Sequence, residues 1–139
     1  SETKAELAGM EMQLPLQTPY SLAAGFGLYD PFGDGGTMHY GVDLAGKRND
    51  PIYSATAGTV TKVFYDSTGG NQIWIQSGKY TFVYAHMSKK AIPHVGDSVS
   101  IGTQIGTMGD TGKVTGVHLH FEIRDASGTS LDPSEILDF

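Results

Sequence analysis

Hydrophobic and polar residues alternate strictly over residues 118–124. In an extended segment the three apolar side chains fall on one side, and His118, His120 and Glu122 fall on the other. A strand with one apolar side packs that side on a core and leaves the opposite side free for chemistry. The stretch therefore predicts a β-strand that presents two imidazoles together on its polar side.

Most of the remaining chain divides into short apolar runs bounded by Gly, Pro, Asn, Asp and Ser, which is typical of strands separated by turns. The runs lie at residues 21–26, 39–44, 51–54, 58–65, 72–77 and 80–86, with a pair of very short strands inside residues 95–109. The dipeptide Gly78-Lys79 predicts a hairpin turn. Only residues 132–137, which contain Pro133, predict a helical turn. The pattern predicts a mainly β domain with Gly-rich loops and little helix.

Composition limits the function of this domain. Glycine provides 19 of the 139 residues, about twice its average usage, and the glycines are scattered among the apolar runs. The net charge of -6, with no run of Lys or Arg, argues against nucleic acid as a partner. No stretch approaches the ~20 apolar residues of a membrane helix, so membrane insertion is not expected. Because the chain has no cysteine, any metal site must use His and carboxylate ligands.

The length of 139 residues suits one domain with its own core. Residues 1–13 are mostly polar and are predicted to form a lead-in or linker. The segment Leu14-Pro15-Leu16 predicts the entry to the fold, so we place the domain at residues 14–139. Within it, the Gly-, Asp- and Pro-rich residues 29–37 predict a loop, either facing substrate or forming a plain surface turn.

A second pair of candidate ligands lies earlier in the chain. His39 and Asp43 are four residues apart, so both can face one side of a helix or an extended segment. Gly41 and the β-branched Val42 favour the extended form. A neutral His nitrogen and an Asp oxygen suit zinc. The H-x-x-x-D pattern is weak alone, but together with the two histidines of the alternating strand it predicts a metal site.

Two further histidines have different settings. His86 ends a strand in which it is predicted to share a face with Phe82 and Tyr84, either as a satisfied core residue or as part of the site. His94 lies in a loop and is predicted to be an ordinary surface residue.

Several segments of the chain form a combination that is far more specific than any one of them. They are His39-x-x-x-Asp43, Tyr84-Ala85-His86-Met87, Gly96-Asp97-x-Val99, Gly106-x-x-Gly109, and Thr111-Gly112 ahead of His118-Leu119-His120-Phe121-Glu122. In this order they resemble the M23 zinc metallopeptidases, the lysostaphin-type or LytM-type catalytic domain. The resemblance covers about residues 14–137.

The resemblance implies a small antiparallel β-sheet domain with a groove over one sheet. It implies one zinc ion per chain with His39, Asp43 and His120 as ligands, and it makes His86 and His118 the catalytic histidines. Members of this family hydrolyse peptide bonds in the stem or cross-bridge of bacterial peptidoglycan, as secreted autolysins, bacteriocins and phage or prophage endolysins. We therefore expect a monomeric zinc endopeptidase that acts outside the cell or at the cell wall.

Three protein ligands leave the fourth position of tetrahedral zinc open, which is typical of catalytic rather than structural sites. Zinc polarises a carbonyl and acidifies bound water, and a neutral His nearby can move the proton. Glu122 and Tyr84 are candidates to orient the ligands, or else an exposed carboxylate and a packed ring. Gly33 stands where several glycine-bridge-cleaving relatives have a Tyr, so we expect hydrolysis next to Ala, Gly or Ser rather than at pentaglycine alone.

Three alternatives compete with this hypothesis. A phosphotransferase IIA glucose-like phosphocarrier has a similar Gly-rich β architecture and a His-x-Gly-x-Asp stretch like residues 39–43, but it does not need the paired strand histidines and His86 as well. A lipoyl- or biotinyl-like carrier, suggested by residues 95–99, needs a Lys at an exposed hairpin tip, where only Lys113 is near. A catalytically inactive M23-like binding module usually lacks ligands, and here all three are present.

Overall fold

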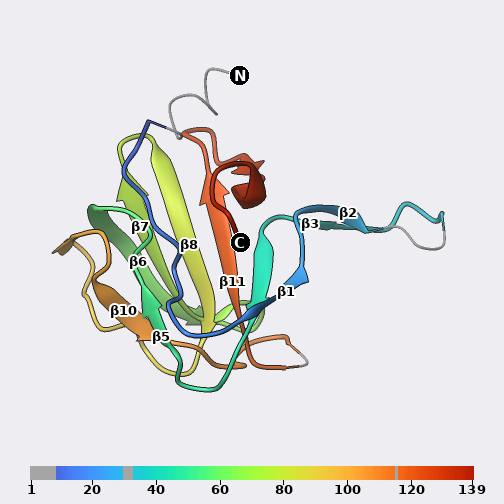
Figure 1. Cartoon of the computed structure of the whole chain (residues 1–139), viewed down its shortest axis with the longest axis horizontal. Coiled ribbons are helices and arrows are strands. Elements are labelled where there is room, and N and C mark those ends of the chain that lie inside the picture. Colours follow the sequence, from blue (N-terminus) through green and yellow to red (C-terminus); the bar gives the residue numbers. More distant parts are fainter. Residues whose placement is uncertain (1–8, 30–32, 115) are drawn as a thin grey trace.

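The computed structural model describes residues 9–29, 33–114 and 116–139. Residues 1–8 of the predicted lead-in, residues 30–32 of the predicted loop and residue 115 lie outside the described residues. The strands of the main sheet are β1 (Ser21–Ala24), β4 (Val42–Ala45), β6 (Gly58–Asp66), β7 (Gly70–Ser77), β8 (Tyr80–Met87), β9 (Ser98–Val99), β11 (His118–Arg124) and β12 (Ser130–Leu131). They form one antiparallel sheet in the order β1-β4-β11-β8-β7-β6-β9, with β12 beside β11 (Figure 1).

Two smaller antiparallel sheets complete the described fold. One pairs β10 (Gln104–Thr107) with β5 (Pro51–Tyr53). The other pairs β2 (Gly27–Tyr29) with β3 (Thr37–His39), and this hairpin projects from the side of the main sheet (Figure 1). A 3-10 turn, η1 (Pro133–Glu135), follows β12, and the Asp132 carboxylate caps it by accepting a hydrogen bond from the Ser134 backbone N–H.

The prediction of a mainly β, antiparallel domain is confirmed. The predicted strands appear with ends shifted by a few residues at most, and the helical turn is confirmed as η1. The Gly78-Lys79 turn joins β7 to β8, with Ser77 and Tyr80 paired on either side of it. The hairpin of β2 and β3 and the short strand β12 were not predicted, and the predicted run 39–44 is divided between the end of β3 and β4.

One face of the main sheet carries the core. Leu119, Phe121 and Ile123 of β11 are fully buried there, as their alternation predicts. The same face of β7 and β8 adds other fully buried side chains, namely Ile73, Ile75, Phe82 and Tyr84.

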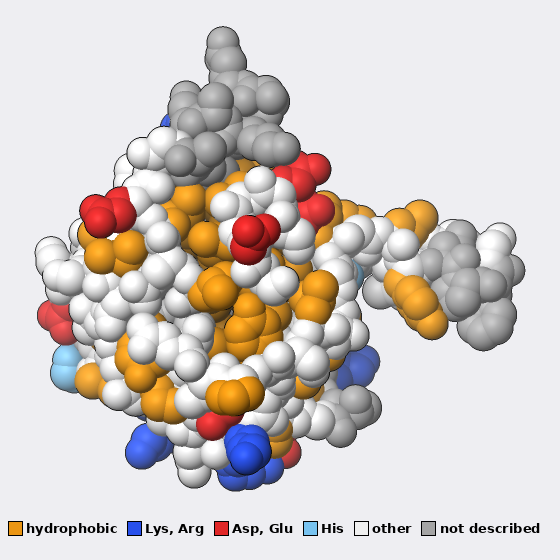
Figure 2. All heavy atoms as spheres, in the orientation of Figure 1, with side chains coloured by type: hydrophobic (Ala, Val, Ile, Leu, Met, Phe, Trp, Pro, Cys, Tyr) orange, Lys and Arg blue, Asp and Glu red, His pale blue; other side chains and the backbone are white. Residues whose placement is uncertain are grey.

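The described N-terminal segment and the C-terminal turn cross over this core face (Figure 1). Their partly buried side chains pack on the core, namely those of Met10, Met12, Ile136, Leu137 and Phe139. From the same side, Figure 2 shows hydrophobic side chains gathered between these segments. Because this face is filled by packing, the polar side chains of β11 are left to the opposite face.

Candidate metal centre

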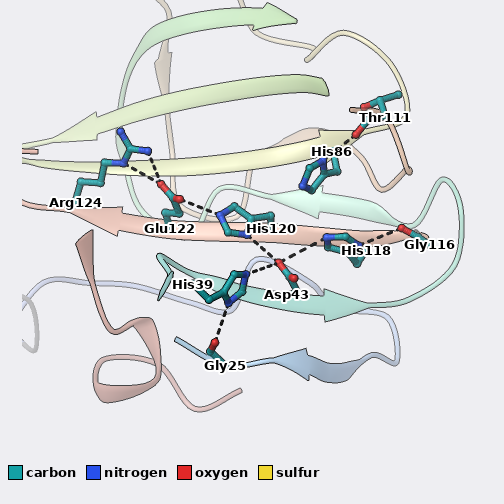
Figure 3. Close-up of polar contacts among 10 residues, drawn as sticks. All are labelled: Gly25, His39, Asp43, His86, Thr111, Gly116, His118, His120, Glu122 and Arg124. Atoms are coloured by element: carbon teal, nitrogen blue, oxygen red, sulfur yellow. Dashed lines mark hydrogen bonds and ion pairs between the residues drawn. The ribbon is translucent and has the colours of Figure 1, made fainter. Parts of the chain in front are cut away.

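Two neighbouring strands bring the candidate ligands together on the polar face of the sheet. His120 of β11 lies directly opposite Asp43 of β4 in the antiparallel register. His39 ends β3, and a two-residue connection leads from it into β4. One ligand atom from each of these three residues lies within 4.8 Å of the others, and the side chains converge as Figure 3 shows. Residues 77 positions apart in the sequence thus meet in one cluster.

The connection between His39 and Asp43 depends on glycine. A Cβ added to Gly41 would lie 2.4 Å from the Phe121 carbonyl oxygen and 2.8 Å from Cγ of Glu122. Any side chain at this position would push β4 away from β11. Glycine therefore permits the close approach that brings Asp43 beside His120.

Backbone and carboxylate acceptors fix both imidazoles of the cluster. Nδ1 of His39 donates a hydrogen bond of 2.8 Å to the Gly25 carbonyl oxygen, which leaves Nε2 facing Asp43 Oδ1 at 3.3 Å. His120 uses Nδ1 toward Asp43 Oδ1, at 2.8 Å, and Nε2 toward Glu122 Oε1, at 2.9 Å. The nitrogens that face the centre are therefore Nε2 of His39 and Nδ1 of His120. A partner on the other ring nitrogen is the usual setting of a metal-binding histidine.

The carboxylates beside His120 set its charge. Burial acts to lower the pKa of His120, but its hydrogen bonds to Asp43 and Glu122 outweigh burial and raise that pKa to about 9. Burial acts to raise the pKa of Asp43. The histidines His120, His118 and His39 outweigh burial and hold the pKa of this carboxyl below its ordinary value. Without metal, protonated His120 thus lies beside ionised Asp43, and a cation that binds here must displace a proton.

A β-bulge carries His86 to the same face. Asn71 pairs with Met87 and Ile73 pairs with Tyr84, so β8 has one more residue than β7 in this interval. His86 takes up the extra residue with a φ of +61°, a left-handed conformation that is uncommon outside glycine. The prediction that His86 shares a face with Phe82 and Tyr84 is therefore wrong. The side chain turns into the groove, because the bulge interrupts the alternation.

His86 and His118 lie beside each other, next to the cluster of His39, Asp43 and His120, with ring centroids 4.9 Å apart. Nδ1 of His86 donates to the Thr111 carbonyl oxygen at 2.8 Å, and Nδ1 of His118 donates to the Gly116 carbonyl oxygen at 3.1 Å. These bonds leave Nε2 of each ring free of a backbone partner, and Nε2 of His118 lies 3.6 Å from Asp43 Oδ1. Burial lowers the pKa of His86, so this ring is neutral at pH 7 and can accept a proton.

The groove that contains this cluster has a volume of about 670 Å³. Its lining runs from His39 across β4, β11 and β8 to Trp74 on β7 and Phe64 on β6. His94 lies outside it with a side chain that is 81% exposed, which confirms the prediction of an ordinary surface residue.

Of the two candidates for orienting a ligand, only Glu122 contacts a candidate ligand, His120. It is buried and bonded to His120, and Nε of Arg124 donates to its second oxygen at 2.8 Å. Tyr84 is the packed ring that was its alternative assignment. It is fully buried in the core, and its hydroxyl accepts a hydrogen bond from the Ala55 backbone N–H. Arg124 and Trp74 were not singled out as site residues, although the alternation of their strands puts both on the polar face.

Comparison with known proteins gives these observations a family context. The model of Peptidase family M23 matches residues 37–133. The peptidoglycan DD-endopeptidase ShyC of Vibrio cholerae is 39% identical over 85 residues, which are 60% of this chain and 19% of that protein. This chain thus spans about a fifth of the length of that curated relative.

Two solved structures have the same fold. A zinc-containing peptidase from Vibrio cholerae superposes with a TM-score of 0.80 at 29% identity, covering 88% of this chain and 38% of the other. The catalytic domain of lysostaphin from Staphylococcus simulans gives a TM-score of 0.74 at 34% identity, covering 83% of this chain and 90% of the other. Similarity to an isolated catalytic domain over nearly its whole length indicates that the described fold corresponds to such a domain.

Proposed function

This chain belongs to peptidase family M23, a family of zinc-dependent peptidases, and on that premise we propose that it is an endopeptidase of bacterial peptidoglycan. The proposed zinc ligands are His39, Asp43 and His120, with one ion per chain. His86 and His118 are the proposed catalytic histidines. We further propose that the protein acts as a monomer, outside the cell or at the cell wall.

One observation carries the proposal: the three ligand atoms converge within 4.8 Å on the floor of a groove, beside two imidazoles. Two imidazole nitrogens and one carboxylate oxygen form a donor set that zinc accepts, and three protein ligands are the number found in catalytic zinc sites. Each imidazole of the cluster already has a partner on the nitrogen that faces away from the centre. The residues present therefore fit the ion.

A bound zinc ion supplies a Lewis acid for the scissile carbonyl and acidifies water. The protein supplies the proton transfers. Hydrolysis forms a bond from a water oxygen to the carbonyl carbon, breaks the C–N bond and moves a proton to the departing amine. Nε2 of His86 and Nε2 of His118 are available to accept the water proton and to return one to the amine, because both Nδ1 positions are bonded to carbonyl oxygens.

The proposed substrate bond lies in the stem or cross-bridge, next to Ala, Gly or Ser. Among the described residues, Gly33 adds no side chain to the loop ahead of His39, and a groove of about 670 Å³ holds a few small residues. The name of the Vibrio cholerae relative supports peptidoglycan as the substrate. A phosphocarrier function is not favoured, since the matching family and relatives are peptidases. No helix among the described residues is long and apolar enough to cross a membrane.

The experiment that tests this proposal is incubation with purified cell walls of several cross-bridge types, followed by mass spectrometry of the soluble fragments. We expect new amino termini on Ala, Gly or Ser, and none when a chelator is present. Release of reducing sugar ends, or of amino termini exclusively on Lys, would contradict the proposal.

A further inference from the structure

A buried carboxylate connects the metal cluster to the far part of the groove. Glu122 is only 7% exposed, and both of its oxygens have partners. Oε1 accepts a hydrogen bond from Nε2 of His120 at 2.9 Å. Oε2 accepts from Nε of Arg124 at 2.8 Å, and Nη2 of the same guanidinium lies 2.7 Å away. Figure 3 shows the three side chains in a row along the strand β11.

The Arg124 side chain is itself held in place, although it is long and 30% exposed. Its guanidinium carbon lies 4.6 Å from the centroid of the Trp74 ring, within the range of a cation–π contact. Trp74 stands two strands away from β11, and both it and Glu122 pair with Val83 of the intervening strand β8. Arg124 therefore reaches across one strand to place its charge over the ring.

Trp74 has restraints of its own. Its Nε1 donates a hydrogen bond of 3.2 Å to Oε1 of Gln72, and its ring meets Phe64 edge-on with centroids 5.9 Å apart. On the neighbouring strand β6, Lys62 places Nζ 4.3 Å from the ring centroid. A ring held on several sides is a fixed platform for the guanidinium.

We propose that Arg124, seated on Trp74, is a positioning residue for the metal centre. It fixes the Glu122 carboxylate, and Glu122 fixes the His120 imidazole with Nδ1 toward the ion. This inference rests on the proposed function, in which His120 is a zinc ligand. It adds that zinc affinity depends on two side chains that contact no ligand.

Positioning and simple electrostatics predict opposite effects of removing Arg124. Loss of a positive charge close to the site strengthens the attraction for a cation by Coulomb's law. Loss of the guanidinium also leaves a buried carboxylate with one partner fewer, free to turn away from His120. If positioning dominates, zinc binding weakens in spite of the charge change.

The test is the zinc dissociation constant of the metal-free protein, measured by competition with a chromophoric chelator. Arg124→Gln is expected to bind zinc ~10-fold more weakly or worse, which is the usual effect of losing an outer-shell partner. Arg124→Lys keeps the charge but loses the planar fork, so it should also bind more weakly, whereas electrostatics predicts no change. Trp74→Leu should weaken binding ~3-fold, and Trp74→Phe, which keeps a ring, should bind zinc about as the unmodified protein does.

Arg48 provides the matched control. It forms a similar pair with Asp110, with bonds of 2.9 and 2.8 Å, away from the groove. Arg48→Gln removes the same charge and should leave the dissociation constant unchanged. The visible spectrum of the Co²⁺-substituted proteins adds a readout of ligand geometry, which should change in Arg124→Gln and not in Arg48→Gln.

The outcomes separate this inference from the proposed function. If the unmodified protein and Arg48→Gln bind zinc and cut cell walls while Arg124→Gln binds zinc equally well or more tightly, the positioning role is refuted and the proposed function stands. If the unmodified protein itself does not bind zinc, the metal assignment fails and the positioning role falls with it. Unfolding midpoints of the metal-free variants identify any that fail to fold. If Arg124→Gln is one of them, the zinc dissociation constant of Arg124→Lys decides whether Arg124 has the positioning role.

Discussion

At the scale of single residues, the site is defined by which nitrogen of each imidazole has a fixed partner. His39, His86 and His118 each donate Nδ1–H to a backbone carbonyl, so that Nε2 remains available. His120 is reversed, with Nε2 bonded to Glu122 and Nδ1 directed at Asp43. Because carbonyl oxygens can only accept, the backbone fixes Nδ1 as the protonated nitrogen of His39, His86 and His118. The cluster thus contains two imidazoles directed at the proposed metal position and two beside it, of which His118 has its Nε2 3.6 Å from Asp43 Oδ1.

The charge of His120 gives a prediction about pH. Its folded-state pKa of about 9 lies above the ordinary value of 6.5, so its protonated form stabilises the metal-free fold. This contribution is complete below pH 6.5 and is lost as the pH rises through 9, and its size is at most about 3 kcal/mol. Urea unfolding in the presence of a chelator should therefore show stability falling between pH 6.5 and 9. His120→Gln should lack most of that fall, and an equal fall in the variant would refute this explanation.

At the scale of elements, the alternation of β11 could be read from the sequence, whereas the placement of His86 could not. Leu119, Phe121 and Ile123 of β11 are fully buried on the core face, and the two imidazoles lie on the polar face as predicted. In β8 the same alternation wrongly predicted that His86 lies on the core face. The bulge that moves it depends on the register with β7 and on the left-handed φ at one residue. Neither property leaves a mark in a single sequence. The pairing of residues 43 and 120 on neighbouring strands did not follow from either segment alone, since strand order is a long-range property, and their proximity was expected only from the predicted metal site and the resemblance.

The bulge gives a prediction about Gly70, which faces the loop that anchors His86. Gly70 has a φ of +64°, and an added Cβ would lie 2.3 Å from Oγ1 of Thr111, the residue whose carbonyl accepts from His86. Gly70→Ala should cost about 3 kcal/mol of stability from backbone strain and overpacking, and should reduce the peptidase rate without loss of zinc. Gly78→Ala is the matched control, since φ is +60° and no atom lies within 4 Å of the added Cβ.

The control should cost about 1 kcal/mol, the backbone strain alone. Denaturation midpoints and cell-wall hydrolysis rates of the two variants provide the comparison. Equal destabilisation by the two alanines would show that Gly70 is not closely packed against Thr111, the residue that binds His86, and would contradict this prediction.

At the scale of the whole molecule, packing and chemistry occupy opposite faces of one sheet. The core cluster contains Leu119 and Phe121 of β11 and none of the three proposed ligands. The described N-terminal segment and the C-terminal turn close the core face, and the groove lies on the other face. A substitution at a ligand should therefore remove metal without unfolding the domain. This separation makes the metal content of single variants a direct readout of the site.

The measurement that tests the central claim most directly is the zinc content of His118→Ala and His120→Ala, determined by elemental analysis beside the rate of cell-wall hydrolysis. His118→Ala should retain about one zinc per chain and lose ~10²-fold or more in rate, as expected for loss of a proton-transfer group. His120→Ala should be folded, free of zinc and inactive, because two remaining ligands bind far more weakly. A metal-free His118→Ala protein beside a zinc-loaded His120→Ala protein would contradict the assignment of ligand and catalytic residues.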